Sequence, residues 1–442
     1  MLKKLKNSLF YKIKFIFAQN FKEMKKILLL TLLSFFTINS IAQLVPGQPT
    51  AVIPGFGAAD NARVITTGVP FMLIAADARS AGMADIGVAT SADAFSQQWN
   101  PSKSAFALSK QGIGVTYTPY LGKLVNDVFL GNITYYNRLN EQSAVAASFR
   151  YFSSGEIELR ETIDQEPLIV KPNELLFDLT YSLRLSERIA MAVTGRYIRS
   201  DLKLQTAIED ANAANSFAVD ISSYYQSEEM PMSSFDGRWR AGINISNIGP
   251  KLKYDEVGSE SFLPTNLALG AGFDFILDQY NTVGVTAQLS KLLVPTPPIY
   301  GTEISYIDEN GDGQYDEGDE ITGRIENNSI YKGKDPNVPF FKGMFQSFGD
   351  APNGISEELQ EVTWALGAEY WFRDVFAFRM GYFNENPNKG ARQFFSVGAG
   401  FKYTTINIDL SYLISTSKVV SPLEGTLRFG LTFNFGDEYD EY

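Results

Sequence analysis

The feature that most constrains the fold is a two-residue alternation of apolar and polar side chains, repeated from Gln111 to Phe435. In the last run of this kind every second residue is apolar: Leu427, Phe429, Leu431, Phe433 and Phe435. Successive side chains of a β-strand point to opposite faces, so each run describes a strand with one apolar face. The sequence therefore predicts an all-β fold of amphipathic strands.

The length of the runs separates a membrane barrel from a soluble sandwich. They span about 10 to 15 residues, whereas soluble strands average ~5 to 6 and a tilted membrane strand needs ~9 to 11. Aromatic residues lie at the ends of many runs, as interfacial girdles require: Tyr135, Tyr151, Trp239, Tyr370, Phe372, Tyr382 and Tyr403. The polar faces carry isolated charges suited to a wet or plugged lumen: Arg150, Arg240, Glu369 and Arg379.

The number and spacing of the runs indicate one closed barrel. We count fourteen: 111–120, 127–139, 142–152, 174–186, 187–203, 215–227, 236–249, 263–276, 279–293, 358–372, 373–386, 390–404, 405–417 and 422–436. An even number is usual in bacterial outer-membrane barrels. Short connections alternate with longer ones. If both ends of the chain are periplasmic, the short turns are periplasmic and the long loops lie outside the cell. We predict a 14-stranded antiparallel transmembrane β-barrel over residues 111–436, in the bacterial outer membrane.

The beginning of the chain has the pattern of an export signal. Lys25 and Lys26 precede an apolar run from Ile27 to Phe36, and small residues at Ser40 and Ala42 would suit cleavage before Gln43. We interpret residues 1–42 as a signal peptide whose true start is Met24. Its removal would change the formal net charge from -12 to -19, because it takes away eight lysines and one glutamate. A phosphate-backbone partner is therefore not expected, since that interaction needs clustered basic residues.

Residues 43–110 belong to no predicted barrel strand. The stretch from Val45 to Gly57 contains three prolines and is expected to be extended. Residues 71–106 are small and polar, with possible helical turns, and the segment is long enough to fold into the lumen. We predict an amino-terminal extension and luminal plug over 43–110, with a mobile periplasmic tail as the alternative. Residues 437–442 form an acidic tail.

Two absences exclude most enzyme mechanisms. The chain has no histidine and no cysteine, so it can form neither a Ser-His-Asp triad nor a cysteine nucleophile, and it lacks imidazole and thiolate metal ligands. A lipid-anchoring cysteine and disulfides are excluded as well. We predict that the protein is not an enzyme.

One local motif has the spacing of a calcium-binding loop. The sequence DENGDGQYDEGD places oxygen ligands at alternate positions and Gly313 at the sharp turn. The predicted ligands are Asp308, Asn310, Asp312, Gln314 through its carbonyl, Asp316 and Asp319. The last position carries Asp in place of the usual Glu. No helices are expected beside the loop, so calcium would order the longest external loop; a solvated acidic turn is the alternative.

The last predicted strand also carries an assembly motif. The sequence RFGLTFNF, from Arg428 to Phe435, resembles the carboxy-terminal β-signal read by the bacterial barrel-assembly machinery.

A resemblance to a known family is carried mainly by the segment from Phe71 to Phe106. Its matching positions are Asp77-Ala78-Arg79, Gly82-Met83, Gly87-Val88-Ala89-Thr90 and Trp99-Asn100-Pro101; the segments Tyr117–Val128 and Ser148–Ile157 are similar too. This pattern resembles the PorV (LptO) family of the Bacteroidota type IX secretion system, outer-membrane barrels related to the FadL transporters. Ala76 and Ser102 depart from the pattern, and the loop 294–357 has no counterpart that we identify.

The resemblance implies a function and a set of partners. Members of the family act as shuttles that bind the C-terminal signal domains of secreted cargo at the large translocon barrel and deliver them to a cell-surface attachment complex. The loops expected to contact these proteins are 152–174, 204–214, 249–262 and 294–357. The alternative is a FadL-like transporter of long-chain fatty acids or other hydrophobic small molecules. A third reading, an esterase acting on lipopolysaccharide, lacks the histidine that such a hydrolase usually employs as its base.

Overall fold

The structure is a computed structural model, which describes residues 48–54, 63–122, 124–125, 127–160, 166–202, 212–255, 258, 260–417 and 421–439. The predicted signal peptide, most of the predicted loop 204–214 and the end of the acidic tail lie outside these residues. The chain divides into two compact units: Met1–Ala58 with Tyr300–Tyr331, and Ala59–Ile299 with Lys332–Tyr442. Among the described residues, no helix has the length and apolar character needed to cross a membrane.

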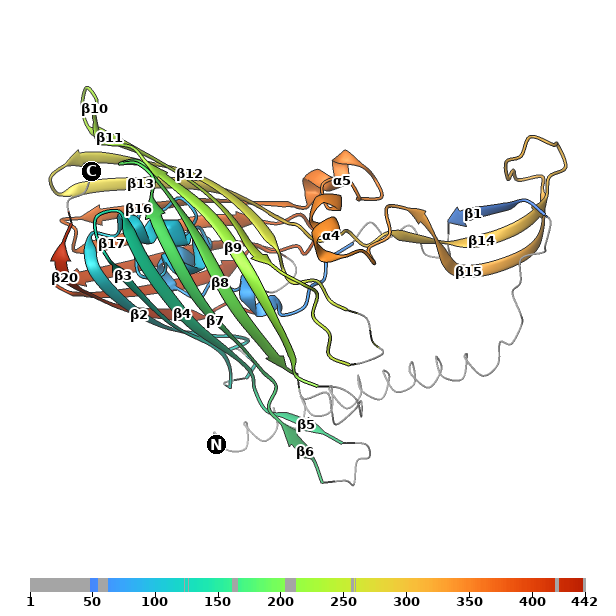
Figure 1. Ribbon diagram of the computed structural model, residues 1–442, viewed down its shortest axis with the longest axis horizontal. Helices are drawn as coiled ribbons and strands as arrows, with labels where there is room; N and C mark the ends of the chain where they lie inside the picture. The colour runs from blue at the N-terminus through green and yellow to red at the C-terminus, as the bar shows by residue number, and fades with distance from the viewer. Residues whose placement is uncertain are drawn as a thin grey trace, which may run out of the picture. The chain divides into compact units, whose positions relative to one another are not determined.

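The larger unit contains a closed barrel of fourteen antiparallel strands, which confirms the predicted fold class (Figure 1). Each strand overlaps one of the predicted runs. The barrel closes where the first strand pairs with the last, through Ile113↔Phe433 and its neighbours. The strands are β2 (Ser109–Pro119), β3 (Val128–Arg138), β4 (Ser143–Ser154), β7 (Asn173–Arg184), β8 (Ile189–Asp201), β9 (Ala214–Gln226), β11 (Asp236–Ile248), β12 (Asn266–Asp278), β13 (Asn281–Leu292), β16 (Val362–Phe372), β17 (Phe376–Asn384), β18 (Gln393–Tyr403), β19 (Ile406–Ser415) and β20 (Leu427–Glu438).

The outer face of the barrel has an apolar band between aromatic girdles. Leu366, Phe378 and Met380 are more than half exposed, as residues facing lipid would be in an isolated chain. Near the long-loop ends of the strands, Tyr382 packs against Trp364 at 5.5 Å and against Phe395 at 4.7 Å between ring centroids. At the other ends, Phe401 packs against Phe376 at 5.3 Å. The period-two pattern thus separates a lipid-facing surface from a lumen.

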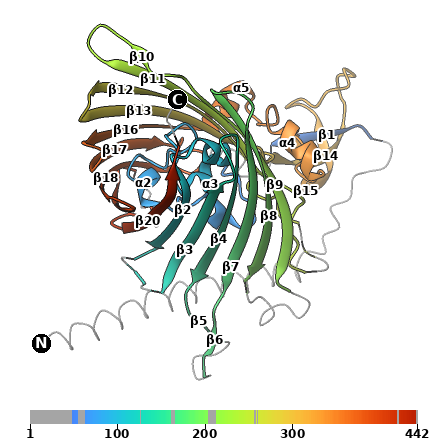
Figure 2. The ribbon, with the colours of Figure 1, turned by 60° about the vertical axis from the view of Figure 1, so that its left-hand side comes forward.

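Residues 70–106 form a folded plug inside the ring of strands (Figure 2). Its elements are short: Gly82 follows the first α-helix of the plug, and Pro101 begins its last 3₁₀ helix just after the second α-helix. These elements are the 3₁₀ helix η1 (Pro70–Leu73), the helices α2 (Ala78–Ala81) and α3 (Ser96–Trp99), and the 3₁₀ helix η2 (Pro101–Phe106). Most side chains in this stretch are buried, and all but Pro70 are at least partly buried, so the plug packs closely within its section of the lumen.

The plug runs from the long-loop end of the barrel to the short-turn end. Phe71 and Met72 pack with Leu130, Leu176 and Ile198, which lie next to the long-loop ends of their strands. Farther along the plug, Ala94 and Ala107 pack with Tyr136 and Ala146, next to the short turn between β3 and β4. The chain therefore crosses the lumen before β2 begins.

This direction corrects one expectation about the ends of the chain. Tyr439 donates its backbone N–H to Leu108 O at 2.8 Å, so the carboxy-terminal end lies at the short-turn end, as predicted. Gly68 N, in contrast, donates to Phe262 O at 2.8 Å, within the long connection between β11 and β12. The described amino-terminal segment therefore lies at the opposite end of the barrel from the carboxy terminus, whereas both were expected on the same, periplasmic side. The predicted alternation of short turns and long loops does not depend on the direction of the plug, because it depends only on the end of the barrel at which β2 begins.

The long connection between β13 and β16, which was predicted to be a loop, contains strands and helices. In the smaller unit, β1 (Thr50–Pro54), β14 (Ile299–Ile307) and β15 (Glu320–Lys332) form a three-stranded sheet in that order. The larger unit contains α4 (Phe340–Gln346) and α5 (Ile355–Gln360) from the same excursion. Two further short pairings occur in loops: β5 (Ile157–Leu159) with β6 (Leu168–Val170), and β10 (Met230–Pro231) with β11.

Candidate functional site

The plug approaches the barrel wall more closely than side chains on the wall would allow. A Cβ built on Gly242 of β11 would lie 2.2 Å from the Val88 carbonyl oxygen. A Cβ on Gly381 of β17 would lie 2.4 Å from the Met83 carbonyl carbon, and Gly82 faces Gly398 in the same way at 3.1 Å. Glycines on the inward face therefore serve here for close backbone approach. The plug backbone fits directly against bare strand backbone.

A buried ion cluster joins the plug to the opposite wall. Arg79 of α2 donates from Nε and Nη2 to the Glu369 carboxylate of β16, at 3.0 and 2.8 Å. Arg79 also binds Asp93 of the plug at 2.8 Å. Arg379 of β17 binds the same Glu369 and also Asp409 of β19, each at 2.6 Å. Each of these charges has a partner of opposite sign, which is the condition for keeping charges in a dehydrated interior.

A second buried cluster lies on the other side of the lumen. Arg196 of β8 binds Asp178 of β7 at 2.5 Å and Asp220 of β9 at 2.9 Å. Arg150 of β4 lies 3.5 Å from Asp178 and donates to the Met72 carbonyl oxygen of the plug at 3.4 Å. The cluster ties four adjacent strands together and contacts the plug at its outer part.

The residues that carry the family resemblance hold the plug together. Asp77 caps α2 by accepting from Ser80 N at 2.7 Å, and it accepts from Trp99 Nε1 at 2.7 Å. The ring of Trp99 lies against Gly87, where a Cβ would come within 2.1 Å of the indole. Asn100 donates to Val88 O inside the plug and to Ser223 O of the wall, at 2.9 and 3.0 Å. These positions specify a plug conformation and its seat in the barrel.

At the long-loop end of the barrel lies a cluster of acidic and basic side chains, which we call the outer rim and define by Arg63, Lys291, Asp350, Glu357, Glu358, Glu361 and Lys389. Glu357 of α5 binds Arg63 at 2.6 Å and Lys389 at 2.7 Å. Glu361 binds Lys291 at 2.6 Å and Lys389 at 2.9 Å. The outer rim joins the amino-terminal segment, α5 and the connection between β17 and β18.

Two carboxyls of the outer rim have pKa values displaced in opposite directions. Burial raises the pKa of Asp350 to about 6, with Glu358 and Glu361 adding to the rise and Lys291 opposing it. Burial also acts to raise the pKa of Glu357, but hydrogen bonds from Arg63 and Lys389 outweigh it and hold that pKa at about 2. Ionised Glu357 stabilises the outer rim, whereas ionised Asp350 does not.

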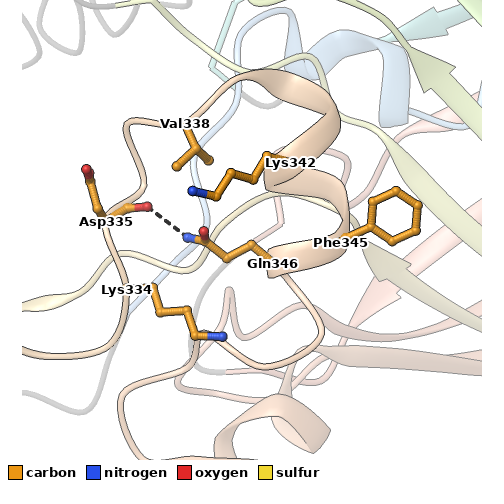
Figure 3. Close-up of a pocket in the computed structure, with 6 residues that line it drawn as sticks. All are labelled: Lys334, Asp335, Val338, Lys342, Phe345 and Gln346. Carbon is orange, nitrogen blue, oxygen red and sulfur yellow. Dashed lines mark hydrogen bonds between the residues drawn. The ribbon is translucent and has the colours of Figure 1, made fainter.

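Near the outer rim in the chain, α4 and the segment before it line an open pocket (Figure 3). The pocket has a volume of about 690 Å³ and is lined by Lys334, Asp335, Val338, Lys342, Phe345 and Gln346. Gln346 Nε2 donates to the Asp335 carbonyl oxygen at 2.8 Å and so joins α4 to the segment before it. On the outside of α4, Phe341 and Phe345 are exposed and lie 5.2 Å apart between ring centroids. Exposed apolar side chains on a loop commonly mark an interaction surface.

The predicted calcium-binding loop lies between β14 and β15, in the smaller unit. Asp308 accepts from Gly311 N and Gly313 N at 2.7 and 2.8 Å, and Asp319 accepts from Glu309 N and Asp316 N at 3.1 and 2.9 Å. Asn310 and Asp312 each accept from the backbone two residues on, while Asn310 Nδ2 donates to Asp316. Across the described ranges, no group of three or more carboxylates is arranged to hold a metal ion.

The sequence identified some of these residues and not others. Arg150, Arg240, Glu369 and Arg379 are buried in the lumen, as their positions on the polar faces predicted. The outer rim was not predicted, because its partners are far apart in the chain: Arg63 and Glu357 are 294 residues apart. The proline-rich segment signalled only that the residues before Arg63 are extended.

A comparison with protein-family models identifies the chain. Residues 57–299 match the model described as type IX secretion system protein PorV. The chain belongs to the PorV family. As a barrel of this family, it resides in the bacterial outer membrane and has a role in type IX secretion. No curated protein matches the sequence.

Among solved structures, similar folds are outer-membrane channels and transporters. The CymD monoaromatic hydrocarbon channel has 13% identity and a TM-score of 0.44, with 84% of this chain and 99% of that chain covered. A Pseudomonas aeruginosa FadL homologue has 11% identity and a TM-score of 0.42, covering 85% and 100%. The Ralstonia pickettii toluene transporter TbuX has 9% identity and a TM-score of 0.44, covering 83% and 100%.

The buried cluster of Arg79, Asp93, Glu369, Arg379 and Asp409, which we call the central ion cluster, should contribute to the stability of the folded barrel. Replacing Glu369 by Gln removes the charge that Arg79 and Arg379 share, so Arg79 keeps only Asp93 and Arg379 keeps only Asp409 as ionic partners in the lumen. We expect a loss of about 3 to 5 kcal/mol in the free energy of unfolding, measured by denaturant titration of the folded barrel. As a control, Glu228→Gln removes an exposed partner of Arg188 and is expected to cost about 0 to 1 kcal/mol. Equal costs for the two variants would contradict the role of the cluster.

The outer rim should respond to pH through Asp350 and Glu357. Because the pKa of Asp350 is raised, its stabilising contribution is complete below its ordinary value of 3.8 and is lost as pH rises through about 6. Because the pKa of Glu357 is lowered, its contribution is complete above 4.5 and is lost as pH falls through about 2. Of these two carboxyls, Asp350 is the one that changes protonation between pH 5 and pH 7, so the outer rim should be less stable at pH 7.

Hydrogen exchange of residues 350–361, corrected for the intrinsic rate, measures this effect. We expect faster corrected exchange at pH 7 than at pH 5 in the native protein and no such difference in Asp350→Asn. A difference that persists in the variant would assign the effect to another group.

Proposed function

We propose that the protein is the outer-membrane shuttle of a type IX secretion system. It binds the C-terminal signal domains of secreted cargo at the translocon and delivers them to the cell-surface attachment complex. Membership of the PorV family carries this proposal. Large surface structures at the long-loop end support it, since a shuttle must present a protein-binding surface outside the barrel.

The filled lumen favours a shuttle over a FadL-like transporter of hydrophobic small molecules. A transporter needs a path for its substrate past the plug. Here Arg79, Glu369, Arg379 and Asp409 connect the plug to the wall, and Gly242 and Gly381 admit plug backbone rather than a ligand. Moving the plug would expose several charges whose partners lie across the lumen, which is costly. The role we propose is therefore non-enzymatic and does not use the lumen as a channel.

The protein-binding surface that we propose includes the outer faces of α4 and α5. Phe341, Phe345, Ile355 and Leu359 are all more than half exposed, and the first two form an aromatic pair. Large apolar side chains that remain exposed in a folded loop are typical anchors of a protein interface. Leu168 and Ile169 of β6 offer a second exposed apolar site within the predicted contact loop 152–174.

Purification from outer membranes in mild detergent tests the function. We expect the tagged protein to bring down a very large barrel and several secreted proteins that share a carboxy-terminal domain, identified by mass spectrometry. The double variant Phe341→Ser, Phe345→Ser should reduce their recovery at least ~10-fold, the effect of losing ~1.4 kcal/mol. Tyr280→Ser, at a short turn, is the matched control. Recovery of bound lipids and no protein partner would support the transporter instead.

Calcium binding by the loop from Asp308 to Asp319 stays a prediction of the sequence, and we propose that the ion orders this loop. Asp312→Ala should abolish any calcium-dependent protection of residues 300–331 from protease. Glu317→Ala changes a carboxylate that is not a predicted ligand and should leave that protection intact. Protection that is unchanged by calcium, or unchanged in Asp312→Ala, would rule out the site.

A further inference from the structure

The amino-terminal segment contacts parts of the chain that belong to the long-loop end. In the smaller unit, β1 pairs with β14 over five residues, from Thr50↔Ser305 to Pro54↔Gly301. Tyr306 N donates to Pro49 O at 3.2 Å, and Thr322 of β15 hydrogen-bonds Gln48. The strands β14 and β15 lie in the connection between β13 and β16, which is the longest connection at that end.

A second set of contacts, inside the larger unit, gives the same location. Arg63 donates from Nε and Nη2 to the Glu357 carboxylate at 3.0 and 2.6 Å, so it is held in the outer rim. Gly68 binds Phe262, and Val69 packs with Leu252 and Leu263 in the connection between β11 and β12. Residues 48–54 and 63–69 are therefore both fixed to long-loop structure, independently of each other.

Gly301 of β14 leaves the space that β1 needs to pair with β14. A Cβ at Gly301 would lie 2.4 Å from the Ile53 carbonyl oxygen and 2.8 Å from the Val52 side chain. Any side chain at this position would push β1 away. Without β1, the edge of β14 would present unpaired backbone groups to water or to other chains.

We propose that the amino-terminal segment of this chain lies at the cell surface, where β1 acts as a strap that holds the β14–β15 hairpin in its folded form. In an outer-membrane barrel the long-loop end faces outward. The plug then passes from the surface to the periplasmic end before β2 begins, so the barrel must close around it when β2 pairs with β20. The strapped hairpin would form part of the partner-binding surface, a role that rests on the proposed function; the surface location does not.

Cysteine labelling tests the location without background, because the chain has no cysteine. Thr50→Cys replaces an exposed residue of β1. On intact cells, a membrane-impermeant maleimide should label it as fully as Gly349→Cys in the connection between α4 and α5. Glu141→Cys, in the short turn between β3 and β4, should be labelled only after the outer membrane is permeabilised. Labelling of Thr50→Cys that requires permeabilisation would overturn the proposal.

Paired proline variants test the strap. Hydrogen-bonded pairs alternate along an antiparallel ladder, and the bond between Tyr306 and Pro49 puts Ala51 and Ile53 in hydrogen-bonded positions. Ile53→Pro therefore removes a donor to β14, whereas the N–H of Val52 points away and Val52→Pro is the matched control. We expect Ile53→Pro to accelerate proteolysis of residues 300–331 on intact cells at least ~10-fold, because cleavage follows the open population. Equal cleavage in both variants would refute the strap.

Partner recovery with the same variants separates the two proposals. If Ile53→Pro loosens the hairpin and lowers partner recovery relative to Val52→Pro, the strap supports the binding surface. If it loosens the hairpin while recovery is unchanged, the hairpin has no role in binding, and the surface location of β1 stands on the labelling result. Absence of partners in the native protein would contradict the proposed function alone.

Discussion

Charge pairing inside the barrel is the constraint on which the rest of the structure depends. Arg79, Glu369, Arg379 and Asp409 are buried together, and Glu369 is shared between a plug residue and a wall residue. Such clusters are weak evidence for net stability, but removing one partner is costly because it strands a charge in a dry interior. Glu369 of the wall therefore needs Arg79 of the plug as one of its two ionic partners. Inward glycines such as Gly242 and Gly381 make that seat possible by admitting plug backbone.

The same principle organises the outer rim. Glu357 and Glu361 accept from Arg63, Lys291 and Lys389, groups that come from the amino-terminal segment, the end of β13 and the connection between β17 and β18. One set of ion pairs therefore holds the plug in the lumen, and a separate set holds the structures at the long-loop end. For the shuttle that we propose, these contacts would hold the external binding surface in place, whereas a gated channel would have to break those that hold the plug.

The barrel could be predicted from the sequence because its signal is local. Alternation such as that from Leu427 to Phe435 depends only on neighbouring residues, and every strand of the barrel wall overlaps a predicted run. The inward orientation of Arg379 could be predicted in the same way, because it occupies a polar position of the alternating pattern. The pairing of β1 with β14 could not be found this way, because Val52 and Glu303 meet only through tertiary structure. Prolines indicated an extended segment there, but an extended segment gives no information about its partner.

The end of the barrel at which the chain enters could not be predicted, for the same reason. Nothing local in residues 63–69 says which end of a barrel they occupy, whereas the contacts of Arg63 with Glu357 decide it. The sequence singles out Asp77, Trp99 and Asn100 only because they match the pattern of the family. Their roles, a helix cap, a hydrogen bond to that cap and a link to the wall, became clear from the structure.

The most direct test of a locked lumen is the electrical conductance of the purified full-length protein, reconstituted in a planar lipid bilayer. We expect the native barrel to insert without opening a steady ion-conducting pore, because ion pairs between Arg79 and Glu369 hold the plug in place. Gly381→Leu, which places a side chain where the plug backbone lies, should insert and conduct. A steady pore in the native protein, equal to that of the variant, would show that the plug does not block the lumen and would favour a FadL-like transporter.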